Sequence, residues 1–209
     1  MKKEQKRIIL DEMSNRFTSF YDNLGFEFNK ELLEFNKSGQ IIRLEPEAEY
    51  ATKIIFTISL STQHDKIRLV KDELFPEIPT SFTTYKLQEN VLDITQFGYQ
   101  QYYKAWPISN LQDINIMLEE HKLFMANCGF TFLTSFSNLN GIHENLNLKI
   151  MNEHTTLKFT MNNNLRGYIG EREILSGLIT AYLIDFDRVE ELIECYKESI
   201  VRGDFERYQ

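Results

Sequence analysis

Apolar residues recur at helical spacing near the start of the chain and over much of its second half. In the first of these stretches they lie three or four positions apart and form one stripe, namely Ile9, Met13, Phe17, Phe20 and Leu24. Such a stripe is typical of a helix with one face in a protein core. Patterns of this kind predict helices over residues 9–24, 110–128, 170–184 and 187–201.

Between the first two of these helices the pattern changes to that of strands. The clearest strand covers residues 50–61, where apolar residues occupy alternate positions: Ile54, Phe56, Ile58 and Leu60. Its length and its β-branched residues predict a central place in a sheet. Shorter strands are predicted at 32–35, 40–44, 81–86 and 91–94. The polar cluster 36–39 predicts a hairpin turn, and Pro46 predicts the end of the return strand.

One pattern occurs twice, because residues 20–28 and 124–132 both fit Phe-x-x-Asn-x-Gly-Phe-x-Phe. Each copy predicts a helix that ends at a glycine, Gly25 or Gly129, and is followed by a strand. Glycine favours this interpretation since it adopts the left-handed conformation at a helix end at little cost. Either a gene duplication or two independent junctions would explain the pair. Little else matches at the same offset, which favours independent junctions.

Together these elements predict an α+β fold. We expect a mainly antiparallel sheet of about five to seven strands, packed by about four helices. The chain has 209 residues, which is enough for one substantial core. We therefore expect a single domain over residues 1–209, sheet-rich over 26–95 and helical over 165–205.

The charge of the chain limits the class of partner. The net charge is −8, it is spread along the chain, and no basic block exists beyond residues 2–7. An acidic protein without a basic face is a poor ligand for nucleic acid. We therefore expect no nucleic-acid partner, and a basic protein is the partner that this charge suits.

Cysteine use and hydropathy indicate the compartment. Cys128 and Cys195 lie far apart, each within a helical pattern, which predicts reduced thiols. The apolar segment 8–10 is too short for a secretory signal, and the uncharged segment 174–184 is too short to span a bilayer. We expect a cytoplasmic protein with no membrane partner.

The histidines and glycines predict no catalytic or metal site. His143 and Glu144 begin the zinc-protease pattern His-Glu-x-x-His, but Asn147 stands where the second histidine belongs. His121 shares a helix face with apolar residues and is predicted to be a packed, hydrogen-bonded core histidine. Residues 167–173 lack the third glycine and the lysine of nucleotide-binding loops. We therefore predict no metal, no cofactor and no catalytic residue.

An aromatic run at residues 99–106 is the best candidate for a binding surface. Tyrosine and tryptophan are favoured at interfaces because they are rigid and amphipathic. The candidate binding residues are Tyr99, Tyr102, Tyr103 and Trp106. In the alternative interpretation, Tyr102 and Trp106 close the core over the sheet.

The order of short motifs resembles a family of bacterial domains of unknown function. The motifs are Leu24-Gly25-Phe26, Trp106-Pro107-Ile108, Asp113 within a helix, and Phe130-Thr131-Phe132-Leu133. The resemblance covers roughly residues 9–150. It implies a bacterial α+β protein, but no activity and no catalytic residue. Immunity proteins, which neutralise toxins, are also small acidic α+β proteins of this general kind.

Three functional hypotheses follow. The first is a non-enzymatic protein-binding module, immunity-like, with a basic protein as partner. The alternative is a small-molecule-binding protein or an enzyme, whose site would be assembled from distant residues around His64, His143 or His154. The third is a homo-oligomer that associates through the uncharged segment 174–184.

Overall fold

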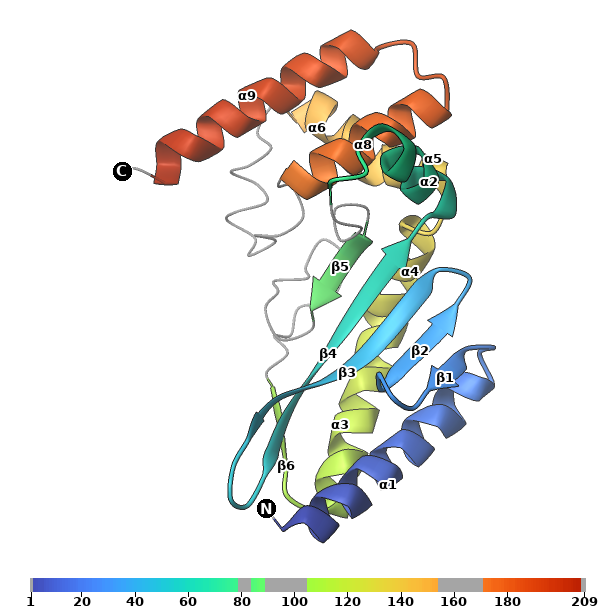
Figure 1. Ribbon diagram of the computed structural model, residues 1–209, viewed down its shortest axis with the longest axis vertical. Coiled ribbons are helices and arrows are strands. Elements are labelled where there is room, and N and C mark those ends of the chain that lie inside the picture. The colour runs from blue at the N-terminus through green and yellow to red at the C-terminus, as the bar shows by residue number, and fades with distance from the viewer. Residues whose placement is uncertain (1, 79–83, 89–104, 154–170, 208–209) are drawn as a thin grey trace. The chain divides into compact units, whose positions relative to one another are not determined.

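The computed structural model describes residues 2–78, 84–88, 105–153 and 171–207 (Figure 1). The chain forms two compact units. Unit 1 comprises Met1–Ser61 and Leu87–Phe132, and unit 2 comprises Thr62–Lys86 and Leu133–Gln209. A sheet and several helices are present, so the predicted α+β fold class is confirmed.

The described strands form one sheet. They are β1 (Glu27–Asn29), β2 (Glu34–Lys37), β3 (Gln40–Glu49), β4 (Ile54–Gln63), β5 (Thr84–Gln88) and β6 (Trp106–Ile108). The order is β1-β2-β3-β4-β5, and β6 also pairs with β4. The pairs β1–β2, β2–β3 and β4–β6 are antiparallel. The predicted central strand is confirmed as β4, which has neighbours on both sides.

The β2–β3 hairpin closes at the predicted turn. Ser38 and Gly39 both have positive φ values, 48° and 82°, as a tight two-residue hairpin turn requires. The predicted break at Pro46 is wrong, because β3 continues to Glu49. The pairing with β2 covers only residues 40–43 of β3. Pro46 therefore lies beyond the part of β3 that pairs with β2, where a missing N–H is tolerated.

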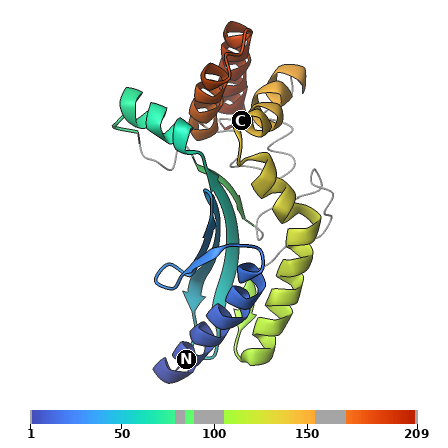
Figure 2. The same cartoon turned by 90° about the vertical axis from the view of Figure 1, so that its right-hand side faces the viewer.

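Two helical segments lie along the same face of the sheet, and they belong to unit 1 as far as Phe132 (Figures 1 and 2). The first is α1 (Lys3–Asp22). The second begins as α3 (Leu111–Phe124) and passes through the π-helix η3 (Met125–Gly129) into α4 (Phe130–Ser135). Helix α1 starts earlier than predicted, and its buried stripe ends at Tyr21 rather than at Phe20 and Leu24.

The second copy of the repeated pattern does not form the predicted junction. Gly25 has φ of +77° and ends α1, as expected, but the helix continues through Gly129 into α4. Gly129 meets a different need. A Cβ at this position would lie 3.1 Å from Leu60 Cδ1 and would collide with Met125 Sδ. The glycine therefore permits close packing of the helix against β4.

The core of unit 1 contains the predicted histidine. His121 on α3 is fully buried, and its Nε2 is hydrogen-bonded to the Tyr21 hydroxyl on α1. Its ring centroid lies 5.6 Å from that of Phe17. The prediction of a packed, hydrogen-bonded core histidine is confirmed.

Unit 2 is mainly helical. Its described helices are α2 (Asp65–Leu74), α5 (Leu139–Ile142), the π-helix η4 (His143–Asn147), α6 (Leu148–Glu153), α8 (Glu171–Leu183) and α9 (Val189–Arg207). Helices α8 and α9 were predicted, whereas α2 and the helical run 139–153 were not. The predicted strand at 91–94 lies outside the described residues. Among the described helices, none has the length and apolar character needed to cross a membrane.

Candidate functional site

The two faces of the sheet differ sharply in chemistry. Side chains alternate along each strand, so neighbouring strands in register share their faces. One face carries buried apolar side chains: Phe35, Ile42, Leu44, Phe56, Ile58 and Leu60. The opposite face carries Glu34, Arg43, Glu45, Glu47, Thr57 and Ser59. We call these six residues the polar face, and they form the candidate functional site.

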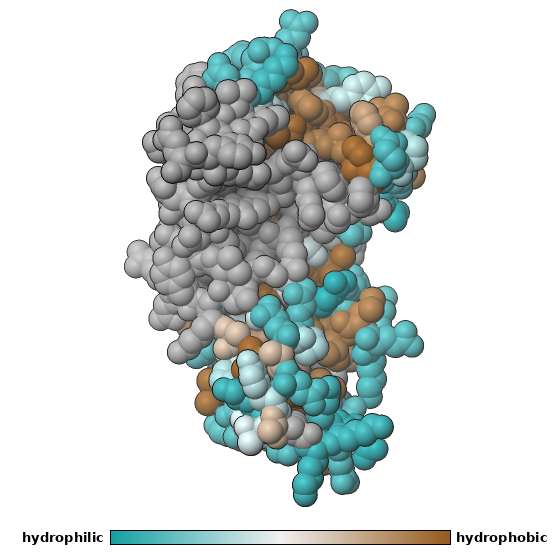
Figure 3. Space-filling view, turned by 60° about the vertical axis from the view of Figure 1, so that its left-hand side comes forward, coloured by the Kyte–Doolittle hydropathy of each residue, from teal (hydrophilic) through white to brown (hydrophobic). Residues whose placement is uncertain are grey.

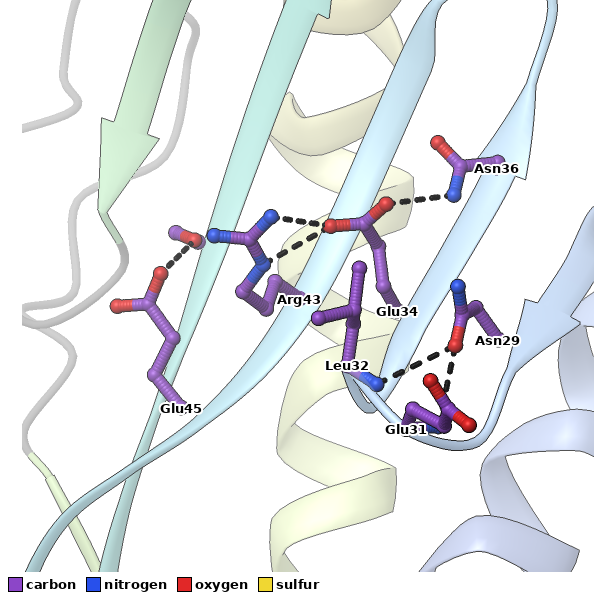
Figure 4. A network of polar contacts seen from close by, with 8 residues as sticks. Asn29, Glu31, Leu32, Glu34, Asn36, Arg43 and Glu45 are labelled. Carbon is purple, nitrogen blue, oxygen red and sulfur yellow. Dashed lines mark hydrogen bonds and ion pairs between the residues drawn. The ribbon is translucent and has the colours of Figure 1, made fainter.

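An ion pair between a buried carboxylate and an exposed guanidinium lies at the β2 end of the polar face. Glu34 and Arg43 are directly opposite in the β2–β3 register. Arg43 donates from Nε (2.9 Å) and from Nη2 to the same oxygen, Glu34 Oε2, while Asn36 Nδ2 donates to Glu34 Oε1 at 2.6 Å (Figure 4). The Glu34 side chain is 7% exposed and that of Arg43 is 46% exposed. The Glu34 carboxylate has little contact with solvent, and the hydrogen bonds and positive charge of the Arg43 guanidinium compensate for this loss.

Two further carboxylates cross from β3 to β4. The Ser59 hydroxyl donates to Glu45 Oε1 at 2.7 Å, and the Thr57 hydroxyl donates to Glu47 Oε1 at 3.0 Å. Both hydroxyl residues are buried, whereas Glu45 is half-buried and Glu47 is exposed. The hydroxyls thus hold both carboxylates against β4 in defined positions.

The loop between β1 and β2 is fixed by a side chain. Asn29 Oδ1 accepts hydrogen bonds from the backbone N–H groups of Glu31 (3.0 Å) and Leu32 (3.3 Å) (Figure 4). This is the local turn that asparagine commonly forms. It orders the connection beside Glu34, so this end of the polar face has a fixed outline.

The polar face carries three carboxylates and one guanidinium. Four of its side chains are therefore charged, and acid predominates. Within the described residues, no group of three or more His, Cys, Asp or Glu side chains could hold a metal ion. Carboxylate oxygens of this kind form charge-assisted hydrogen bonds with lysine and arginine side chains.

The predicted aromatic surface is corrected at one position. Trp106 is 4% exposed and pairs with Phe56 on the apolar face of the sheet, and its Nε1 donates to Glu120 Oε2 at 2.7 Å. Its side chain closes the core, as the alternative interpretation stated, and is withdrawn from any binding surface. Tyr99, Tyr102 and Tyr103 lie outside the described residues, so their assignment stays a prediction.

The structure describes two of the three histidines named in the enzyme hypothesis, His64 and His143. His143 is buried in unit 2, and its Nδ1 lies 3.0 Å from Asn147 Nδ2. Burial lowers its pKa, while the nearby Glu144 raises it. Burial also lowers the pKa of His64, aided by the Lys66 cation and opposed by Asp65. His154 lies outside the described residues.

Unit 2 carries exposed apolar side chains. Leu69 and Leu74 on α2 and Tyr182 on α8 are exposed, and Figure 3 shows brown apolar surface in the upper part of the view. Association through segment 174–184 stays a prediction, because none of these observations identifies what would cover the surface.

Sequence reasoning missed the polar face for a definite reason. Glu45 and Glu47 alternate with Leu44 and Pro46, and this pattern would have indicated a strand with carboxylates on one side. Pro46 was interpreted as the end of the strand, so the alternation was not followed further.

No protein-family model, curated protein or solved structure matches this chain.

Proposed function

We propose that this chain is a non-enzymatic protein-binding module whose polar face binds a basic protein, in the manner of an immunity protein. The observation that carries the proposal is the pair of cross-strand carboxylates, Glu45 and Glu47, each held by a buried hydroxyl of β4. Carboxylates fixed in advance lose little conformational freedom when a partner's cations bind.

The electrostatics also favour this function. A protein with a net charge of −8 attracts a basic partner over a distance of about 8 Å at physiological salt, which raises the association rate. The predicted reduced state of the two cysteines and the resemblance to bacterial domains favour a role in the bacterial cytoplasm. In this proposal the Glu34–Arg43 ion pair maintains the shape of the surface, and Glu47 makes the most exposed contact.

The test is affinity capture with a matched pair of variants. The full chain and the double variant Glu45→Gln/Glu47→Gln are immobilised and exposed to lysate of the source cell at low and high salt. Glutamine retains an oxygen that accepts from Ser59 or Thr57, so the variant removes charge while the cross-strand contacts remain possible. The control, Glu73→Gln/Glu190→Gln, removes the same charge from exposed positions on α2 and α9.

We expect a basic protein to bind the wild type and the control and to bind the Glu45/Glu47 variant about tenfold more weakly or worse. Binding should weaken with salt, and titration of the purified partner should give the same order of affinities. Equal affinity of both double variants, or reproducible capture of no protein at all, would refute the proposed function.

A further inference from the structure

A buried polar cluster joins three helices of unit 2. Asn147 on η4 is fully buried. Its Nδ2 donates to the Gly177 carbonyl of α8 at 2.9 Å and lies 3.0 Å from His143 Nδ1. Its Oδ1 accepts from the Tyr196 hydroxyl of α9 at 2.7 Å. One amide side chain therefore links η4, α8 and α9.

The close approach of these helices depends on the absence of a side chain at Gly177. A Cβ there would lie 2.6 Å from Asn147 Oδ1 and would collide with the Tyr196 hydroxyl. A side chain at position 177 would therefore displace polar atoms of the cluster. Buried polar groups in such a position are costly when a partner is lost.

Counting donors and acceptors fixes the state of His143. The Gly177 carbonyl can only accept, so the Asn147 nitrogen must face it. The second N–H of that nitrogen points at His143 Nδ1, which must then accept and carry no proton. His143 is therefore neutral, with its proton on Nε2, and the edge-to-face Phe186 ring lies 4.4 Å from it, centroid to centroid.

We propose that His143 is an acid-sensitive latch: protonation of its Nδ1 breaks the bond to Asn147 and loosens α8 and α9 from η4. A protonated Nδ1 would point an N–H at an amide N–H. The amide cannot correct this by rotating through half a turn, because its oxygen would then face the Gly177 carbonyl. A single proton therefore disturbs contacts to both neighbouring helices.

The surrounding charges set the direction of the pH effect. Glu144, on the same helix, favours the protonated ring, and burial opposes it more strongly, so the pKa of His143 is lowered. Asn147, the partner of His143, is contacted by the Tyr196 hydroxyl from α9 and by the Gly177 carbonyl from α8. Asp185 and Asp187 flank Phe186 and are exposed. Because the folded-state pKa is depressed, the latch is closed above the ordinary histidine pKa of about 6.5 and is lost as pH falls through the folded pKa.

Two measurements on the full chain test the latch. Nitrogen-15 NMR of the imidazole rings should show His143 as the Nε2–H tautomer at neutral pH, and an Nδ1–H tautomer would overturn the proposal without any variant. Amide hydrogen exchange, corrected for intrinsic rates, should then show α8 and α9 opening up to about tenfold more readily once His143 is protonated, as expected for one lost buried hydrogen bond.

Variants separate the latch from general acid effects. His143→Gln removes the titrating ring, so the pH dependence of exchange in α8 and α9 should disappear. His64→Gln is the control, since His64 also has a lowered pKa but lies outside the cluster, and it should leave that dependence in place. Retention of the dependence in His143→Gln, or unchanged exchange in the wild type while His143 titrates, would overturn the proposal.

Discussion

Two buried threonines of β4 differ in whether their hydroxyl group has a hydrogen-bond partner. Thr57 and Thr62 are both fully buried. The Thr57 hydroxyl donates to Glu47 at 3.0 Å, whereas Thr62 Oγ1 is buried with no partner in the part of the chain that the structure describes. A buried hydroxyl without a partner costs about 1–3 kcal/mol, while a satisfied one contributes about 1 kcal/mol.

The same substitution should therefore have different effects on stability at the two sites. Thr62→Val should leave the free energy of unfolding unchanged or raise it by about 1 kcal/mol, and Thr57→Val should lower it by about 1 kcal/mol. Urea unfolding of both variants measures this difference. If Thr62→Val proved the more destabilising variant, the Thr62 hydroxyl would have to bind a partner in the native protein.

For individual residues, the sequence predicted the burial of a single side chain but not the pairing of side chains on neighbouring strands. His121 was predicted because its helix neighbours are apolar. The burial of Glu34 was not, since a glutamate beside Phe35 is normally exposed. Arg43 makes this burial possible, and it lies opposite Glu34 only through the register that the Ser38–Gly39 turn sets. A pairing of this kind becomes visible only when the register is known.

Among the elements, the repeated pattern shows that one short sequence can serve two structures. Gly25 ends a helix in the left-handed region, at φ of +77°, where Phe26 enters the core. Gly129 lies within a continuous helical run and makes room for Leu60. The glycine is needed for its backbone conformation in the first case and for its size in the second. The sequence contains the glycine but not the reason for it.

These two roles predict that alanine and asparagine substitutions will rank in opposite order of destabilisation at Gly25 and at Gly129. Asparagine adopts the left-handed conformation more readily than alanine, so Gly25→Asn should cost less stability than Gly25→Ala, which should cost about 1 kcal/mol. Gly129→Ala should cost about 1–3 kcal/mol through overpacking, and Gly129→Asn should cost more because it is larger. Chemical unfolding of the four variants gives the two orders. The same order at both positions would contradict the distinct roles assigned here.

Helix α2 was missed for a reason that lies in its packing. Its buried positions are Ile67 and Lys71, so a lysine stands where an apolar residue would complete the stripe. The Lys71 ammonium donates to the Ile78 carbonyl at 2.8 Å and pairs with Asp72, which satisfies it in the interior. Ile67, Val70 and Leu74 still keep helical spacing, so an incomplete stripe was visible in the sequence. A run of good helix formers without glycine or proline was a second available signal.

For the whole molecule, the route of the chain between its two units is the main architectural fact. The chain passes from one unit to the other at Ser61–Thr62, Lys86–Leu87 and Phe132–Leu133. These positions fall inside β4, β5 and α4 respectively. Separate domains are usually joined by irregular linkers in which few contacts cross. Here each passage is part of a regular, hydrogen-bonded element, and the prediction of a single domain can be tested on that basis.

We expect both units to unfold in one cooperative transition, because the loss of either unit would remove hydrogen-bonded residues from elements that also belong to the other. Trp106 makes the test direct. It is the only tryptophan of the chain, and it is buried in unit 1. Its emission reports on unit 1 alone, whereas far-ultraviolet circular dichroism also reports on the helices of unit 2.

The two urea unfolding curves should therefore coincide in midpoint and slope, with Trp106→Phe as the emission control for tyrosine fluorescence. A tryptophan transition displaced from the dichroism transition would show that the units unfold separately, and the chain would then have two domains despite its continuous elements. The same two curves recorded below the pKa of His143 test whether the latch destabilises both units. The latch acts within unit 2, so acid should lower the midpoint of a cooperative molecule as a whole, by tryptophan emission as much as by dichroism.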